Sequence, residues 1–154
     1  MDKERALELA SERLERTLSS INLAQKICDK VDSFLPTGWH SVFLGEDYLE
    51  FCPQYKHKAS SAEFRTVCTL VEKLTGKKLN RRTSGTKDNP KLIASNYSHF
   101  ENGAWLTLWV ESHADDDCKI TYKRTWGMKA IADENCLGRT KQMAEVESWI
   151  LDKP

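Results

Sequence analysis

The stretch WLTLWVESHADDDCKITYKR, residues 105–124, decides the fold that we expect for this chain. Leucine and valine occupy the even positions of its first half, and isoleucine and tyrosine occupy even positions of its second half. Because side chains alternate between the two faces of a strand, both halves predict β-strands with one apolar face. The apolar faces coincide when Ser112 pairs with Cys118, which also sets Val110 opposite Ile120. The pattern therefore predicts an antiparallel hairpin with HADDD as its five-residue loop.

The aspartates at the centre of this stretch, Asp115–Asp117, allow two interpretations. A loop tip in water tolerates like charges, and aspartate suits turns. Carboxylates could instead bind a hard cation, but an EF-hand loop needs alternating acidic residues, a central glycine and a late glutamate. Only Asp115 and Asp117 alternate, and the other features are missing. We therefore expect a solvated loop and no metal.

Two cysteine–histidine pairs give a second metal hypothesis. Four residues separate Cys52 from His57, and four separate His113 from Cys118. If the strand ends that carry these pairs were neighbours, two thiolates and two imidazoles could bind zinc tetrahedrally. Zinc sites usually show tighter pairs such as CxxC, so we interpret the four residues as buried thiols and surface histidines.

A long N-terminal helix is predicted from Lys3 to Ser33, within the segment 1–34. At 1.5 Å per residue it would span about 45 Å, against about 38 Å for a compact domain of this chain length. Its first half could therefore overhang and pair with a second copy, or lie flat on its own domain. The apolar residues that recur every seven positions are Leu7, Leu14, Ile21 and Cys28.

The remaining segments alternate between strand and helix patterns. Aromatic and β-branched residues over 39–44 and 48–52 predict a hairpin. Ser60 and Glu63 fit a capping box at the start of a second helix, which we expect to end at Gly76. Further strands are predicted over 91–100, 104–112 and 118–126, and a third helix over 140–151.

These elements predict one domain, 1–154, of the α+β class. Its core would be an antiparallel sheet of about five strands, with the long N-terminal helix and two further helices packed on it. Three helices are enough to cover both faces of such a sheet. We therefore expect Trp105 and Trp109, on the face opposite the leucines, to be covered by a helix.

Composition and charge favour an ordinary soluble domain. The chain is 40% hydrophobic and 30% charged with zero net charge, which fits a globular protein. No apolar run approaches the roughly 20 residues that cross a bilayer, and the first residues lack the apolar core of a signal peptide. Five cysteines, an odd count without a CxxC motif, indicate reduced thiols. We therefore expect a cytoplasmic location.

Positive charge is concentrated in the segment 73–91. It carries seven lysines and arginines and a single acidic residue, Asp88. Such a cluster could neutralise phosphates and give salt-dependent nucleic-acid binding, or it could meet an acidic protein partner. Alternatively, its lysines are favoured by the dipole at a helix C-terminus, and Arg81 and Arg82 protect a strand edge from aggregation.

The candidate binding residues combine this basic segment with the two tryptophans and a lysine of the neighbouring predicted strand. Aromatic side chains among cations could stack nucleic-acid bases. The set comprises Lys77, Lys78, Arg81, Arg82, Lys87, Trp105, Trp109 and Lys123.

Recognisable catalytic motifs are missing from the sequence. It contains no GxSxG, HExxH or GxGxxG motif and no complete phosphate-binding loop. We therefore expect a small, cytosolic, non-catalytic binding protein without a cofactor. It would self-associate through its N-terminal helix and act by occupying a partner or ligand. Two alternatives stay open: a nucleic-acid-binding protein that uses residues 73–91, and a small hydrolase or nucleotide-sequestering protein.

Overall fold

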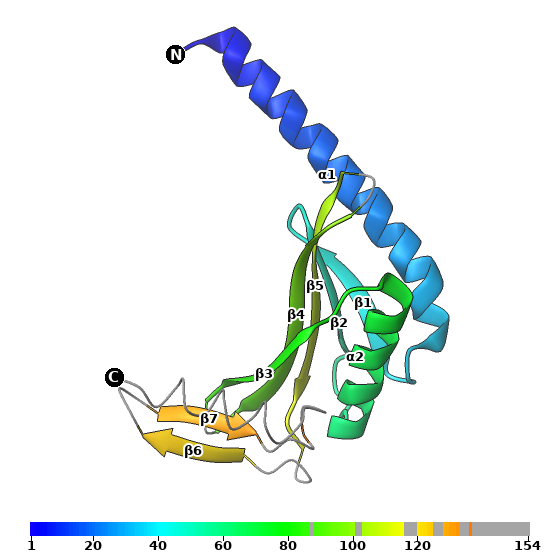
Figure 1. Cartoon of the computed structure of the whole chain (residues 1–154), viewed down its shortest axis with the longest axis vertical. Coiled ribbons are helices and arrows are strands. Elements are labelled where there is room, and N and C mark those ends of the chain that lie inside the picture. Colours follow the sequence, from blue (N-terminus) through cyan, green and yellow to red (C-terminus); the bar gives the residue numbers. More distant parts are fainter. Residues whose placement is uncertain (87, 101–102, 116–119, 125–127, 133–135, 137–154) are drawn as a thin grey trace.

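The chain has an α+β fold in which two α-helices pack on a five-stranded sheet (Figure 1). The computed structural model describes residues 1–86, 88–100, 103–115, 120–124, 128–132 and 136. The elements are α1 Lys3–Val31, the 3₁₀ turn η1 Asp32–Phe34, β1 Trp39–Leu44, β2 Tyr48–Pro53, α2 Ser61–Thr75, β3 Asn80–Gly85, β4 Pro90–His99, β5 Trp105–His113, β6 Ile120–Arg124 and β7 Met128–Ala132. The third helix that we expected, over 140–151, lies outside the described residues.

The sheet is mixed, and the expectation of a purely antiparallel sheet is wrong. Its strands follow the order β1-β2-β5-β4-β3. All neighbours are antiparallel except β2 and β5, which are parallel, with Leu49 beside Leu108. Parallel neighbours need a crossover connection. The segment α2-β3-β4 is this crossover, because it connects β2 to β5 and lets β5 run beside β2 in the same direction.

The hairpin expected between residues 104–112 and 118–126 is also wrong. Both edges of β5 are occupied, one by β2 and the other by β4, and β6 pairs with β7 instead. The partner of β5 along the chain is the preceding strand: His99 pairs with Trp105 across the turn that contains Gly103. The alternation itself is confirmed, since Leu106, Leu108 and Val110 are fully buried on one face.

The core lies between this face of the sheet and the two helices. The capping box of α2 is formed as predicted: Ser60 Oγ accepts a hydrogen bond from the Glu63 backbone N–H (3.1 Å), and Glu63 Oε2 accepts one from the Ser60 backbone N–H (2.8 Å). Gly76 ends the helix with a left-handed φ of 71°. The side chains that fill the core from the helices are Leu23, Ile27 and Val31 of α1 and Phe64, Val67, Cys68 and Val71 of α2.

Helix α1 projects beyond the sheet (Figure 1). Its buried residues begin only at Ser20, whose hydroxyl donates a hydrogen bond to the Trp105 carbonyl (2.9 Å). The preceding turns therefore extend away from the core, and their side chains remain mostly exposed.

Among the described residues, no helix is both long and apolar enough to span a bilayer. Cys28, Cys52 and Cys68 are free thiols, but Cys136 takes part in a disulfide, so the expectation of reduced thiols throughout is wrong there. An odd cysteine count leaves one thiol over but does not prevent pairing. The cytoplasmic location stays a prediction.

Candidate functional site

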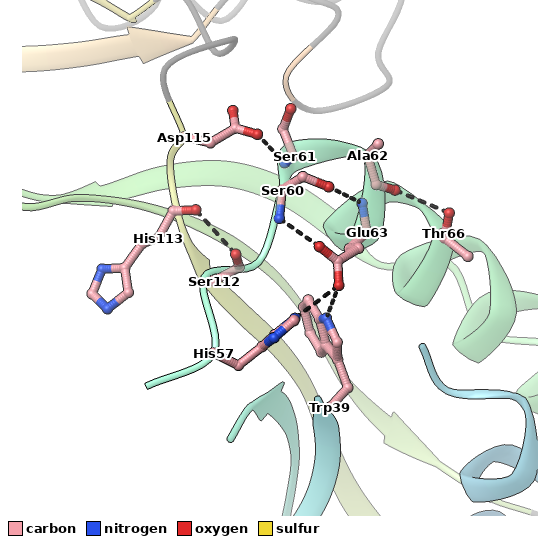
Figure 2. A network of polar contacts seen from close by, with 10 residues as sticks. All are labelled: Trp39, His57, Ser60, Ser61, Ala62, Glu63, Thr66, Ser112, His113 and Asp115. Atoms are coloured by element: carbon pink, nitrogen blue, oxygen red, sulfur yellow. Dashed lines mark hydrogen bonds and ion pairs between the residues drawn. The ribbon is translucent and has the colours of Figure 1, made fainter. Parts of the chain in front are cut away.

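A polar junction forms where the N-terminus of α2 meets β1 and the loop that follows β2 (Figure 2). Its centre is the Glu63 carboxylate. Glu63 Oε1 accepts a hydrogen bond from Trp39 Nε1 (3.2 Å) and lies 2.9 Å from His57 Nε2, while Oε2 accepts the backbone N–H of Ser60. The His57 ring lies against Gly38: a Cβ built there would be 2.5 Å from the imidazole.

This junction connects α2 to β1 and to the loop after β2. Burial raises the pKa of Glu63, but hydrogen bonds from Ser60, His57 and Trp39 outweigh it, so that the net pKa lies below the usual value. The ionised carboxylate is bonded through both oxygens, so it holds a helix, a strand and a loop together.

Asp115 adds a second carboxylate at the same helix terminus. Its Oδ2 accepts the backbone N–H of Ser61 (2.7 Å), and the positive end of the helix dipole favours a negative charge there. Asp115 is only partly exposed, so the expectation of a solvated aspartate loop is wrong for this residue. Asp116 and Asp117 lie outside the described residues.

The other candidate region is the sheet face turned away from α1 and α2, which we call the open face. Trp105 is 45% exposed there, and Tyr97 beside it is exposed as well, so the expectation of a covering helix is wrong for Trp105. The Trp105 and Tyr97 rings stack with centroids 5.0 Å apart, and His99 lies at 4.8 Å. The two described helices, α1 and α2, bury their apolar side chains against the opposite face, which carries Leu106 and Leu108.

A second aromatic group lies further along β5. The Trp109 ring is 5.5 Å from the Tyr48 ring, and the Arg82 guanidinium lies 5.1 Å from the Trp109 centroid. Arg82 also donates a hydrogen bond to Ser95 Oγ (2.7 Å), which holds it over the indole. Trp109 is therefore partly buried, and among the described residues Tyr48 of β2 and Arg82 of β3 lie against its ring.

Two carboxylates, Glu50 and Glu111, lie beside this aromatic group. Together with Tyr48 and Trp109 they line a cavity of about 480 Å³. Burial first, and then the negative charge of Glu111, raise the pKa of Glu50. Burial and the two glutamates raise the pKa of Tyr48 to about 12, so its phenol stays protonated at neutral pH.

Only part of the basic segment lies on the open face: among the described residues, Arg82 lies over Trp109 and Lys91 forms an ion pair with Glu111 there. Arg81 forms an ion pair with Glu72 of α2 on the helix side of the sheet, and Lys77 donates a hydrogen bond to the His99 carbonyl (3.2 Å). Lys78 is exposed at the end of α2. Of the candidate cations, Arg82 lies against a tryptophan of this face. Lys87 and the side chain of Lys123 lie outside the part of the chain that the structure describes.

A third region, where α1 leaves the sheet, also fails to favour an anion. Trp105 and Tyr97 form part of the wall of a cavity of about 600 Å³ there. Arg13 in its wall donates a hydrogen bond to Glu46 (2.7 Å). Among the described residues, the charged side chains around this cavity are Glu12, Glu15, Glu46 and Asp47 against Arg13 and Arg16. Carboxylates outnumber cations, so a phosphate would be repelled.

Three of the four residues in the zinc hypothesis lie around the same cavity, although they are distant in sequence. Cys52, His57 and His113 line one cavity of about 630 Å³. Among the described residues, however, no group of three or more His, Cys, Asp or Glu side chains could hold a metal ion. Burial raises the pKa of Cys52 to about 11, which keeps it a thiol. Cys118 lies outside the described residues.

Sequence reasoning missed Tyr48, Glu50 and Glu111 as possible site residues. The alternation along 48–52 sets Tyr48 and Glu50 on one face, which was a usable signal. It did not show that β2 lies next to β5, and this parallel pairing is what brings Glu50 beside Trp109.

Comparison with known proteins finds no family model, no curated protein and no solved structure that matches this chain.

The substitution Glu63→Gln tests the junction. The folded pKa of Glu63 lies below its unfolded value, so its ionised form contributes stability above the unfolded pKa that is lost as the pH falls through the folded pKa. We expect a loss of about 2 kcal/mol in the free energy of unfolding at neutral pH, which shrinks below about pH 4. Urea unfolding over a pH series measures it. Glu12→Gln, on the exposed part of α1, is the control, and an equal effect there would contradict the assignment.

Gly38→Ala tests the contact beneath His57. Gly38 and Gly45 both have left-handed φ angles, of 92° and 63°, but a Cβ at Gly45 meets no atom within 4 Å. Both alanine variants should lose about 1 kcal/mol from backbone strain, and Gly38→Ala should lose at least about 1 kcal/mol more from the clash. Thermal unfolding of the two variants compares them. Equal losses would show that His57 moves aside without cost.

Glu50→Gln tests the electrostatics of the open face. The folded pKa of Glu50 lies above its unfolded value, so the stability it contributes is present below the unfolded pKa and is lost as the pH rises through the folded value. The variant should therefore be more stable than the parent at neutral pH, and the difference should vanish in acid. A variant that is less stable than the parent at pH 7 would contradict the crowding of Glu50 by Glu111.

Proposed function

We propose that this protein is a non-catalytic binding protein that self-associates through the projecting half of α1 and engages a partner with its open face. The non-catalytic part rests on the sequence, which contains no recognisable catalytic motif. The self-association part rests on one observation, a stripe of exposed leucine and isoleucine side chains along α1, which we call the stripe.

The stripe lies on a different side of α1 from the face that packs on the sheet. At about 100° per residue, its centre is about 130° around the helix from the centre of the packed face. An apolar stripe that its own domain does not cover is a common sign of helix pairing. Its members, with exposed fractions between 41% and 61%, are Leu7, Leu14, Leu18 and Ile21.

The stripe is self-complementary in an antiparallel pair. With Leu14 on the two-fold axis, Leu7 of one copy lies opposite Ile21 of the other, and Ala10 lies opposite Leu18. Such an isologous contact closes as a dimer. It also separates the two sheets, because each packs near the C-terminal end of its α1. A parallel pair would bring both sheets to the same end.

Nucleic-acid binding is the second candidate. The exposed stack of Trp105 on Tyr97 favours it, because such rings can stack on bases. The excess of carboxylates around the nearby cavity disfavours it, since phosphates need cations.

Leu14→Glu tests self-association. The intact chain should be a dimer, and this substitution should weaken the dimer at least about tenfold, because it sets two carboxylates against each other on the axis. Leu9→Glu is the matched control: Leu9 is 48% exposed on the same turns of α1 but lies outside the stripe.

Light scattering coupled to gel filtration, over a range of protein concentrations, gives the mass of each variant. Removal of residues 1–16 should give a monomer as well. An intact chain that stays monomeric throughout, or an equal effect of Leu9→Glu, would contradict the proposal. Circular dichroism confirms that each variant keeps its helix content.

A further inference from the structure

We propose that the cavity between Tyr48, Trp109 and Glu50 on the open face binds the ammonium group of a lysine side chain in a partner protein. The basic segment predicted a ligand of negative charge, whereas this inference names a ligand of positive charge. It concerns the open face alone and does not depend on pairing through α1.

Charge is the first argument. Among the described residues, the ionisable side chains that line this cavity are Asp47, Glu50, Glu111 and the neutral phenol of Tyr48, and none is a lysine or an arginine. Glu111 is partly compensated, because Lys91 Nζ lies 3.6 Å from it. Glu50 forms no hydrogen bond or ion pair with a described residue. Lys91 also acts on Glu50 and Arg82 lies over Trp109, so these two cations neutralise part of the charge. The three carboxylates of the lining still outnumber them among the described residues, which favours a cation over an anion.

The aromatic rings are the second argument, and they select an organic cation over a metal ion. A lysine ammonium is attracted to the faces of tryptophan and tyrosine rings. The Trp109 indole already holds one organic cation, the Arg82 guanidinium, at 5.1 Å. Leu44, in the wall of the same cavity and 44% exposed, offers an apolar surface for the methylene stem of a lysine.

The extent of the groove favours a protein chain over a free amine. Glu50 and Glu111 also line the neighbouring cavity of about 630 Å³, so the two cavities adjoin along β2 and β5, and we call the pair the groove. Its far end is lined by Lys56, Lys58 and the exposed ring of Tyr55. An extended segment with a lysine in the first cavity would continue into the second, where acidic or neutral residues fit.

The test uses the full chain and defined probes. Nuclear magnetic resonance follows the indole N–H signals while the peptide acetyl-Gly-Ser-Lys-Ser-Gly-amide is added. The control peptides carry norleucine or glutamate in place of lysine. We expect the lysine peptide to shift the Trp109 signal in a saturable way and the other two to leave it in place.

The matched variants are Glu50→Gln, which removes the unpaired carboxylate, and Glu46→Gln, which removes a neighbouring carboxylate outside this cavity. Glu50→Gln should weaken the lysine peptide about tenfold, and Glu46→Gln should leave its affinity unchanged. Because Glu50→Gln relieves repulsion in the free protein, unfolding does not explain a loss of binding, and thermal unfolding checks this.

Three outcomes would overturn the inference. The glutamate peptide could bind as well as the lysine peptide, or Glu50→Gln could leave the affinity unchanged. n-Butylammonium could bind as tightly as the lysine peptide, which would make this a small-amine site. A parallel titration with octathymidylate tests for a nucleic-acid ligand. If the oligonucleotide shifts the Trp109 signal and the lysine peptide does not, the open face is a nucleic-acid surface and the inference is wrong.

Discussion

The central position of β5 is the constraint on which the rest of the structure depends. Its even-numbered side chains are buried against the helices, while its odd-numbered side chains form the middle of the open face. A shift of one residue in its register would exchange the two sets and would expose three fully buried side chains, Leu106, Leu108 and Val110. At about 1.5–3 kcal/mol for each such side chain, this exchange would cost a large part of the stability of a single domain. The core and the candidate binding face are therefore set by the same pairing.

The sequence predicted the elements of this fold better than their partners. The period of seven along α1, the capping box of Ser60 and Glu63 and the left-handed Gly76 are local features, and each has one physical meaning. The partners of β5 are not local. Alternation fixes which side chains share a face, but it is the same for a strand paired with the segment before it or after it. Our choice of the later segment was wrong because nothing in the pattern records that both edges of β5 are already occupied.

Charge was the least reliable guide to the candidate site. The segment 73–91 is basic along the chain, but Arg81 points to the helix side, where Glu72 neutralises it, and Arg82 lies on an indole. Glu50 and Glu111 are far apart in sequence and become neighbours only through the parallel pairing of β2 with β5. A count of charges along the chain cannot detect such a pair. In the structure, burial and then the negative charge of Glu111 raise the pKa of Glu50.

The two proposals combine into a geometric argument about affinity. In the antiparallel pair centred on Leu14, the sheets would lie about 22 residues apart along the helix axis, or roughly 33 Å at 1.5 Å per residue. Each copy would then present one groove of modest affinity for a single lysine. A partner that carries two lysine-bearing segments at a matching separation would bind the second groove as an intramolecular step, at a much higher effective concentration. Self-association would in this way convert a weak contact on the open face into a strong one, and the projecting half of α1 would set the spacing at which this happens.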